Sequence, residues 1–278
     1  MKTSPGSPVF FCLILLLAWG SFASPALSAD YITGSGCSVS NIGYLSDLAK
    51  EYERRTGVKV FVRGGGSMIG IEDLRGNKVD FAASCRNRGA DDPKDVAFIQ
   101  VAWDALVFIV HKSNPVENIS LDAVRAIYAG KIVNWEKLGG KHAPIRLFFS
   151  RPQMGLSGVE ASTNGMVLRG KAPAKTPNAQ SLVSAGIVEE MVGKTPVGFA
   201  TTGFSSARKR NVKMLKVNGV FPSRKSIASG AYPFRRPLFL LVPKHPKQAV
   251  RRFVDFALSR EGQQFISSIG AVSLQDVR

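Results

Sequence analysis

A run of glycines with one serine is the clearest candidate for binding chemistry in this sequence. Gly64 to Gly70, with the sequence GGGSMIG, follows an apolar segment and precedes a helical pattern. Such a turn lets backbone N–H groups converge on an anion at a helix N-terminus, and Ser67 adds a hydroxyl donor. Glycine runs are also common in flexible strand-to-helix connections. By itself the segment therefore predicts either an anion cradle or a plain connection.

Three successive segments with strand character each run into a polar loop. Residues 31–33 lead into Gly34 to Ser38, residues 58–62 lead into the glycine run, and residues 79–83 lead into Ser84 to Arg86. Apolar residues at helical spacing separate the first two strands, which is typical of an α/β fold. All strand C-termini of an open parallel sheet lie at one edge, where ligands bind. We therefore expect these loops to meet in one crevice.

The rest of the chain predicts a second lobe and a return to the first. A continuous apolar strand at 105–110 ends in a polar turn, and a helix follows with Ser120 as its N-cap. A strand at 145–149 runs into another polar loop, and residues 237–242 form a strand that carries the chain back. This pattern predicts a first lobe of residues 30–110 with 237–278 and a second lobe of residues 111–236. The two crossing segments would act as a hinge.

The N-terminus indicates an exported protein, and the charge balance indicates the kind of partner that it attracts. Residues 1–29 combine one lysine, a short apolar run and small residues, as a signal peptide does, and we expect cleavage after Ser28 or Ala29. An uncleaved membrane anchor is the alternative. The net charge of +17 favours anionic solutes or acidic surfaces. The basic residues are scattered without interleaved aromatics, so we expect no nucleic-acid partner.

Several short motifs follow one another in a fixed order. They are ITGSG at 32–36, GGGS at 64–67 with Gly70, a segment from Asp80 to Arg86 that ends in Ser-Cys-Arg, Asp104, GKIVNW at 130–135, Arg151 with Ser157 and Gly158, SGAYP at 229–233 and RPL at 236–238. In order and spacing they resemble the phosphate-binding periplasmic proteins, the substrate-binding subunits of phosphate-type ABC transporters. The resemblance covers essentially the whole mature chain.

This resemblance implies a two-lobed α/β fold of the type II periplasmic-binding-protein class. It also implies a dehydrated oxyanion such as phosphate, held by hydroxyls, backbone amides and an arginine fork, and an ABC permease in the inner membrane as partner. We expect a periplasmic monomer without a cofactor. Carried over by position, the ligand-binding residues are Gly36, Cys37, Ser38, Gly66, Ser67, Cys85, Arg86, Arg151, Ser157 and Gly158.

The sequence departs from the family's pattern at several of these loops. Cys37 and Cys85 stand where the family usually has hydroxyl residues, and the second loop continues with Met68 and Ile69. The family's Ser-Gly-Thr-Arg stretch is Ser-Gly-Val-Glu at residues 157–160 here. A thiol is a weaker donor than a hydroxyl, and each lost donor in a buried anion site costs about 1–3 kcal/mol. These changes put the identity of the ligand in question.

The cysteine pair has three interpretations. Cys12 lies in the predicted signal peptide, so the mature chain keeps Cys37 and Cys85. A disulfide is the usual state of a lone pair in an exported protein, and it needs a Cα separation of roughly 4.4–6.8 Å. A site for a soft metal or another thiophilic ligand, with Met68 or Met154 assisting, is the second. Two free thiols beside an altered anion site are the third.

The usual catalytic signatures are missing from the sequence. The three histidines are His111, His142 and His245, which lie far apart and form no metal-binding spacing. No Gly-x-Ser-x-Gly elbow is present. We therefore expect a non-enzymatic solute-binding protein that captures an oxyanion by hinge closure. The alternative is a binding protein repurposed for a soft metal or thiophilic ligand, or for a regulatory protein contact.

Overall fold

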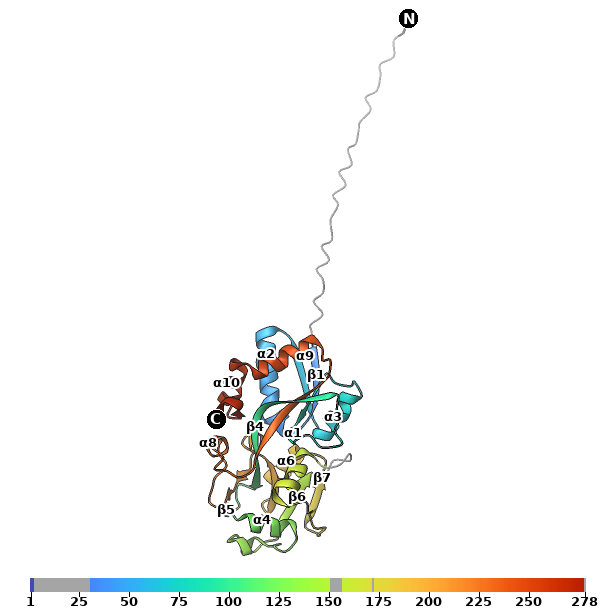
Figure 1. The fold of residues 1–278 in the computed structure, drawn as a ribbon. Helices are drawn as coiled ribbons and strands as arrows, with labels where there is room; N and C mark the ends of the chain where they lie inside the picture. The colour runs from blue at the N-terminus through green and yellow to red at the C-terminus, as the bar shows by residue number, and fades with distance from the viewer. Residues whose placement is uncertain (3–30, 151–156, 172, 278) are drawn as a thin grey trace.

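Figure 1 shows the computed structural model, which describes residues 1–2, 31–150, 157–171 and 173–277. The protein is a mixed α/β structure built around a ten-stranded sheet with helices packed on its faces. This confirms the α/β class predicted from the sequence. The proposed cleavage site, Arg151 and Met154 lie outside the described residues.

The first part of the sheet, at the top of Figure 1, contains the three strands that the sequence predicted. β1 lies between β2 and β3 and is parallel to both, with Gly36 aligned to Gly64 in β2 and to Ala83 in β3. The carboxyl ends of the three strands therefore lie at one edge. The elements are β1 (Tyr31–Gly36), α1 (Ser38–Ser40), the π-helical turn η1 (Asn41–Leu45), α2 (Ser46–Thr56), β2 (Lys59–Gly64), α3 (Ser67–Arg75) and β3 (Phe81–Ser84).

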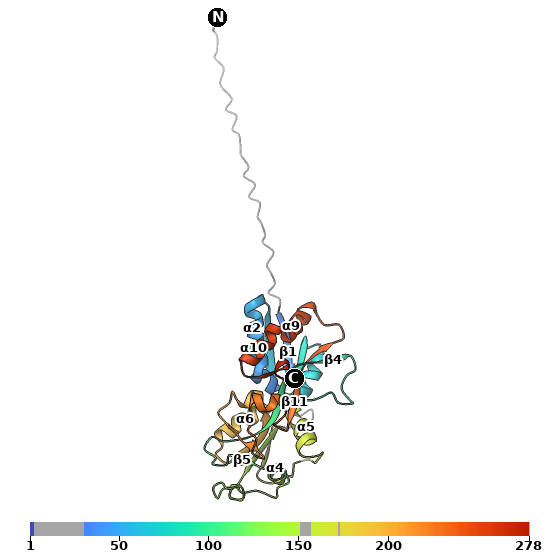
Figure 2. The same cartoon turned by 60° about the vertical axis from the view of Figure 1, so that its left-hand side comes forward.

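Two long antiparallel strands connect this part of the sheet to the second part, as Figures 1 and 2 show. They are β4 (Val96–Val110) and β11 (Arg235–Pro243). β11 pairs with β3 on one side, and β4 pairs with β8 on the other. The sequence predicted only residues 105–110 of β4, because Gln100 and Asp104 interrupt the apolar run that precedes them.

The second part of the sheet, at the bottom of Figure 1, continues from β4 in the order β8, β6, β7. β6 is parallel to both of its neighbours. Its larger elements are α4 (Leu121–Tyr128), β6 (Arg146–Ser150), α5 (Gly158–Ser162), the π-helical turn η3 (Thr163–Val167), β7 (Ala179–Leu182), α6 (Ala185–Lys194), β8 (Gly198–Gly203) and α7 (Phe204–Ala207). The smaller ones are β5 (Asn118–Ile119), η2 (Trp135–Leu138), β9 (Lys213–Met214), β10 (Lys216–Val217) and α8 (Arg224–Ala228).

The C-terminal helices return to the first part of the sheet. They are α9 (Gln248–Leu258) and α10 (Arg260–Ser268), followed by β12 (Val272–Ser273) and η4 (Leu274–Asp276). α9 buries Phe253, whose ring packs 5.2 Å from that of Tyr52 in α2 and 5.4 Å from that of Phe81 in β3, between ring centroids. This packing of an apolar helix face confirms the amphipathic pattern at 249–257.

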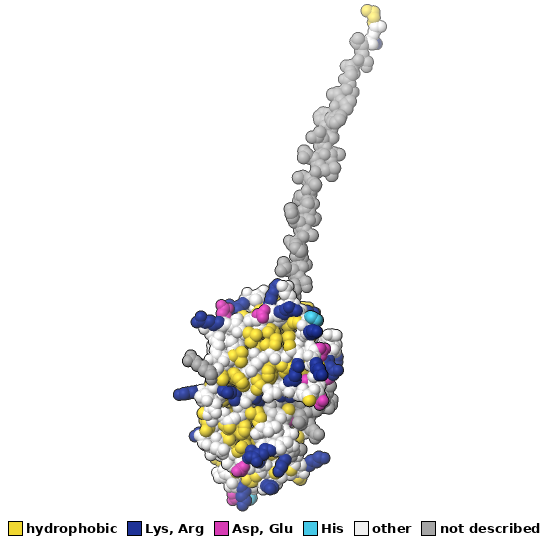
Figure 3. All heavy atoms as spheres, in the orientation of Figure 1, with side chains coloured by type: hydrophobic (Ala, Val, Ile, Leu, Met, Phe, Trp, Pro, Cys, Tyr) yellow, Lys and Arg dark blue, Asp and Glu magenta, His cyan; other side chains and the backbone are white. Residues whose placement is uncertain are grey.

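A local sequence signal places the start of α4 as predicted. Ser120 caps α4 by accepting a hydrogen bond from the Ala123 N–H. The limits proposed for the lobes, after residue 110 and before residue 237, fall at the end of β4 and inside β11. Among the helices of the described part of the chain, none has the length and apolar character needed to cross a bilayer. On the face shown in Figure 3, Lys and Arg side chains are dispersed rather than gathered in one patch.

Candidate functional site

The three loops that follow β1, β2 and β3 meet at the carboxyl edge of the sheet, as their sequence pattern predicts. Both Gly65 and Gly66 donate their N–H to the carbonyl oxygen of Gly36, at 2.9 and 2.8 Å. The Cys37 N–H donates to the carbonyl of Ala83 at 2.9 Å. The loops are therefore fixed to each other by backbone hydrogen bonds, and the glycine run is part of a crevice wall.

Two glycines allow this close approach. Gly36 has a φ of +136°, and a Cβ at this position would lie 2.2 Å from the carbonyl oxygen of Ala83. Gly66 has a φ of +129° and immediately precedes α3. Any other residue would be strained at these φ values, because an L side chain collides with the backbone there. The crevice wall therefore depends on glycine at both positions.

The hydroxyls predicted for the first and second loops are buried against neighbouring segments of the first half. Ser67 begins α3, and its Oγ accepts a hydrogen bond from the Cys85 N–H at 3.3 Å. Ser38 begins the helical segment after β1, and its Oγ lies 3.0 Å from the Cβ position of Gly64. Each hydroxyl is thus placed at the start of a helix, where backbone N–H groups without intrahelical partners are also available.

The second half of the molecule contributes the start of α5. A Cβ on Gly158 would lie 2.5 Å from Ser67 Oγ and 2.6 Å from Cys85 Sγ, so Gly158 closes directly over the first half. Ser157 caps α5 by accepting from the Glu160 N–H at 3.1 Å, and its Oγ is 2.5 Å from that of Ser150. The Ser157 hydroxyl is therefore engaged within its own half. The position predicted for Arg151 lies outside the described residues.

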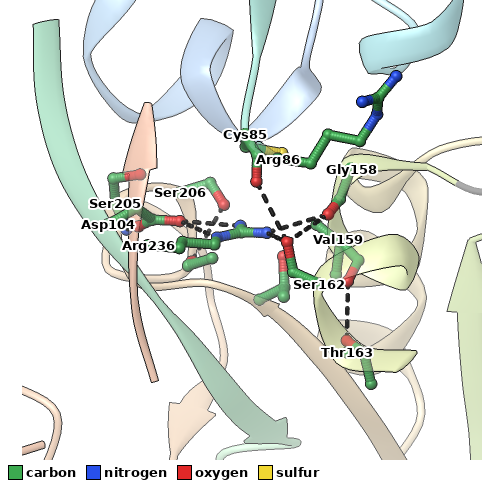
Figure 4. A network of polar contacts seen from close by, with 12 residues as sticks. Cys85, Arg86, Asp104, Gly158, Val159, Ser162, Thr163, Ser205, Ser206 and Arg236 are labelled. Carbon is green, nitrogen blue, oxygen red and sulfur yellow. Dashed lines mark hydrogen bonds and ion pairs between the residues drawn. The ribbon is translucent and has the colours of Figure 1, made fainter. Parts of the chain in front are cut away.

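Arg86 has a carboxylate partner of its own. Its guanidinium binds Asp92 through two hydrogen bonds of 2.6 and 2.7 Å, and a third N–H contact reaches the Met68 thioether sulfur at 2.9 Å. In Figure 4 the Arg86 side chain extends away from Arg236. Arg86 therefore lies at the edge of the crevice with most of its hydrogen-bonding capacity already used.

The arginine at the centre of the crevice is Arg236. It was not among the ligand-binding residues that the family resemblance implied. Its Nε and Nη2 donate to Asp104 Oδ2 at 3.1 and 2.9 Å, and Nη1 donates to the Gly158 carbonyl and to Ser162 Oγ, both at 3.3 Å. Figure 4 shows this guanidinium between β4 and α5. It therefore connects the strands that cross the molecule to the second half.

The sequence does contain a signal for this pair. Asp104 and Arg236 are charged residues within two otherwise apolar segments, and both belong to the motifs that carry the family resemblance. The register of β4 and β11 places them directly opposite each other. Ionisable residues are rarely buried unless they are paired. A search for oppositely charged residues in buried strands would therefore have found both.

The two cysteines are free thiols, so the disulfide expected from their number is not formed in the structure. Both are buried, and each shifts the pKa of the other. Burial acts to raise the pKa of Cys37, but the influence of Cys85, the charge of Arg236 and the neighbouring Ser40 outweigh it and hold that pKa at about 7. Burial and the negative charge of Cys37 raise the pKa of Cys85 well above its usual value.

A cavity of about 570 Å³ gives access to Arg236 from the side of the crevice. Its charged lining residues are three arginines and two aspartates: Arg86, Arg235, Arg236, Asp91 and Asp92. The other lining residues are Met68, Asn87, Gly89, Ala161, Ser162, Gly165, Met166 and Pro237. Asp92 and Asp104 pair with two of the arginines, and Asp91 balances the charge of the third, so the site is polar without a net positive charge.

The described residues do not form a metal site with the usual His, Cys, Asp or Glu ligands. No cluster of three or more His, Cys, Asp or Glu side chains with metal-binding geometry exists among the described residues. The Met68 sulfur, expected as a helper of a soft metal, faces the Arg86 guanidinium instead. The Cys37 and Cys85 thiols are therefore the only part of the predicted soft-metal set that the described residues bring together.

The sequence was compared with protein families and with curated proteins. The PBP superfamily domain matches residues 23–261. The chain is 27% identical to the phosphate-binding protein PstS of Bacillus subtilis, over 89% of this chain and 82% of that protein. It is also 27% identical to PstS of Borreliella burgdorferi, over 87% of this chain and 89% of that protein.

Solved structures resemble the fold over almost the same length. A phosphate ABC transporter substrate-binding protein from Clostridium perfringens, solved with bound phosphate, has a TM-score of 0.77 at 24% identity and covers 88% of this chain and 100% of its own. An ABC-type phosphate transport receptor from Vibrio cholerae has a TM-score of 0.65 at 24% identity, with the same coverage. The family match spans most of the sequence, and the chain belongs to the PBP superfamily.

Proposed function

We propose that this protein is an exported solute-binding protein that captures a small oxyanion, phosphate or a closely related anion, for an ABC permease. The observation that carries the proposal is the position of Arg236. Its buried guanidinium lies where three glycine- and serine-bearing loops of the first half meet the start of α5. The names of the curated relatives from Bacillus subtilis and Borreliella burgdorferi support phosphate as the ligand.

The donors around Arg236 suit a dehydrated oxyanion. Ser38 and Ser67 supply hydroxyls at helix starts, and Gly158 lets the start of α5 lie directly against Ser67. Neutral donors of this kind coordinate an anion without adding opposing charge, and an arginine fork matches tetrahedral oxygens. Since these groups hold the ligand and none attacks it, the proposed activity is binding rather than catalysis.

Closure of the crevice is part of this proposal. Gly158 already contacts Ser67 and Cys85, so an anion reaches the Ser67 hydroxyl only when the second half moves away. The segments able to bend are β4 and β11, which connect the two parts of the sheet. We therefore propose the lobes as residues 30–110 with 237–278 and residues 111–236, acting in a monomer with these two strands as the hinge.

Calorimetric titration of the purified mature protein with inorganic phosphate tests the function. We expect dissociation constants in the micromolar range or below. A protein that gives no heat with phosphate, sulfate or arsenate over the same range would contradict the proposal and favour a role in protein contacts.

A matched pair of serine variants locates the site. Ser67→Ala removes a hydroxyl at the proposed site, and the loss of one hydrogen bond to a charged ligand costs about 1.5–3 kcal/mol, or roughly ten- to hundredfold in affinity. Ser120→Ala removes the hydroxyl that caps α4, away from the crevice, and should leave the affinity unchanged. Equal losses in both variants would place the ligand elsewhere.

A further inference from the structure

The two thiols of the crevice lie in the right place to form a bond. Cys37 and Cys85 follow β1 and β3, which are neighbouring parallel strands, and the Cys37 N–H donates to Ala83 in β3 at 2.9 Å. Gly36 is level with Ala83, so Cys37 is level with Ser84 and one residue away from Cys85 along β3. With strands about 4.8 Å apart and a rise of about 3.3 Å per residue, this offset corresponds to a Cα separation of roughly 6 Å, and disulfides form across roughly 4.4–6.8 Å. The two thiols are close enough for each to shift the pKa of the other. Oxidation therefore requires little movement of the strands.

The two thiols differ in their chemistry. Cys37 lies at the start of the helical segment from Ser38 and close to Arg236, and its pKa is about 7. Burial and the neighbouring Cys37 raise the pKa of Cys85. An acidic thiol beside a less acidic one provides a thiolate that attacks a disulfide and a second thiol that completes the exchange. The pair thus has the features of a reactive dithiol.

The charge of the reduced pair opposes an incoming anion. Asp104 already neutralises Arg236, so a thiolate at Cys37 places a second negative charge beside one guanidinium. Tyr44, which also faces Cys37, has a pKa raised mainly by burial and stays neutral. A disulfide carries no charge. Conversion of the pair to a disulfide therefore removes a negative charge from the site at which we place the oxyanion.

We propose that Cys37 and Cys85 form a reversible dithiol–disulfide pair whose oxidation state sets how tightly the crevice holds its oxyanion. The inference rests on the proposed oxyanion-binding function. The disulfide form is the high-affinity form, and the reduced form is the low-affinity form.

The oxidant is another disulfide, of a protein or of a small thiol. The Cys37 thiolate attacks one sulfur of that disulfide, its S–S bond breaks, and the first thiolate leaves. Cys85 then loses its proton, and its thiolate attacks the Cys37 sulfur and expels the second thiol. The pair loses two electrons and two protons, and the oxidant gains them as two thiols. Because Gly158 covers Cys85, this exchange takes place in the open form.

The experiment has two independent measurements on the mature protein. In the first, the protein is equilibrated in glutathione buffers of different potential, its free thiols are alkylated, and its mass is determined. As the potential of the buffer rises, we expect a single transition from a protein with two alkylated thiols to a protein with none. In the second, inorganic phosphate is titrated into the reduced and oxidised forms at about pH 8 and at about pH 6.

At about pH 8 we expect the oxidised form to bind phosphate about tenfold more tightly, because close charges at the edge of a protein interact by at least ~1.4 kcal/mol. At about pH 6 the difference should shrink, since the Cys37 thiol is then protonated below its pKa of about 7. The control is the double variant Cys37→Ser with Cys85→Ser, whose phosphate affinity should not respond to reductant.

The outcomes separate this inference from the function on which it rests. Failure to form the disulfide at any potential overturns the inference, as does equal phosphate affinity in both forms. The disulfide could form in a protein that binds phosphate in neither oxidation state. That result would overturn both the proposed function and the effect of the disulfide on phosphate affinity, although the mass measurement would still show that the two thiols react with each other. Reductant sensitivity that persists in the double variant overturns the assignment to these cysteines.

Discussion

The guanidinium of Arg236 and the carboxylate of Asp104 form a buried ion pair between β11 and β4. Their side chains are 3% and 0% exposed, and Asp104 Oδ1 also accepts the Ser205 N–H at 2.9 Å. Burial acts to lower the pKa of Arg236, but the negatively charged groups around it, Asp104 among them, raise it, so the guanidinium stays charged. The pair joins the crossing strands at the point where the crevice closes.

Removal of the carboxylate charge should destabilise the whole fold. Asp104→Asn leaves Arg236 buried without a counter-charge, and breaking such a pair costs about 3–5 kcal/mol. Urea denaturation measures the loss in the free energy of unfolding. Asp122→Asn is the matched control, because Asp122 pairs with Arg125 at the surface and is 92% exposed, so its loss should be below about 1 kcal/mol. Similar losses in the two variants would contradict this role for Asp104.

A single methyl group should prevent the crevice from closing. Gly158→Ala places a Cβ 2.5 Å from Ser67 Oγ and 2.6 Å from Cys85 Sγ, whereas Gly165→Ala, on the same helical segment, meets nothing within 4 Å. Overpacking costs about 1–3 kcal/mol, so we expect at least roughly tenfold weaker phosphate binding in Gly158→Ala. Small-angle scattering should show the larger radius of gyration for this variant. Wild-type binding by Gly158→Ala would mean that the ligand-bound form is more open than this structure.

The stability of the protein should depend on the ionisation of Glu160. Burial raises the pKa of this carboxyl from 4.5 to about 8, although it accepts the Ser150 N–H at 3.0 Å. Between these pH values the folded protein binds a proton that the unfolded chain has released, so the stability due to this group falls as the pH rises. The loss amounts to a few kcal/mol between about pH 5 and pH 8.

Glu160→Gln tests this dependence because the amide cannot ionise but keeps an oxygen for the Ser150 N–H. Urea denaturation of both proteins at about pH 5 and about pH 8 isolates the contribution of Glu160, since other titrating groups are common to both. We expect the variant to gain stability relative to wild type at the higher pH. Parallel pH profiles would show that Glu160 is ionised in the folded protein.

Local sequence was sufficient for the elements and for the loops that they position. The strands at β1, β2 and β3 followed from short apolar runs, and the Ser120 cap followed from its place before an amphipathic segment. The meeting of the three loops followed from parallel topology, because carboxyl ends of parallel strands share one edge. These features depend on residues close together in the chain, so the sequence predicts them directly.

Side-chain partners at the centre of the crevice depended on contacts that no local pattern specifies. Asp104 and Arg236 lie 132 positions apart and meet only through the register of β4 and β11. Arg86, predicted as a ligand residue, instead pairs with Asp92. The residue type at a motif position does not reveal which neighbour its hydrogen bonds will reach, because this is set by side-chain rotamers in the packed structure.

For this protein the sequence by itself determined the α/β class, the glycine-rich wall and the candidate hydroxyls. Only the tertiary structure decided that Arg236 lies between β4 and α5, that Arg86 pairs with Asp92, and that Gly158 closes against Ser67. It also brings the thiols of Cys37 and Cys85 close enough to shift each other's pKa. The physical reason is that strands and helices arise from interactions between near neighbours in the chain. The charge and the fit of the crevice arise from residues brought together by the packing of the whole fold.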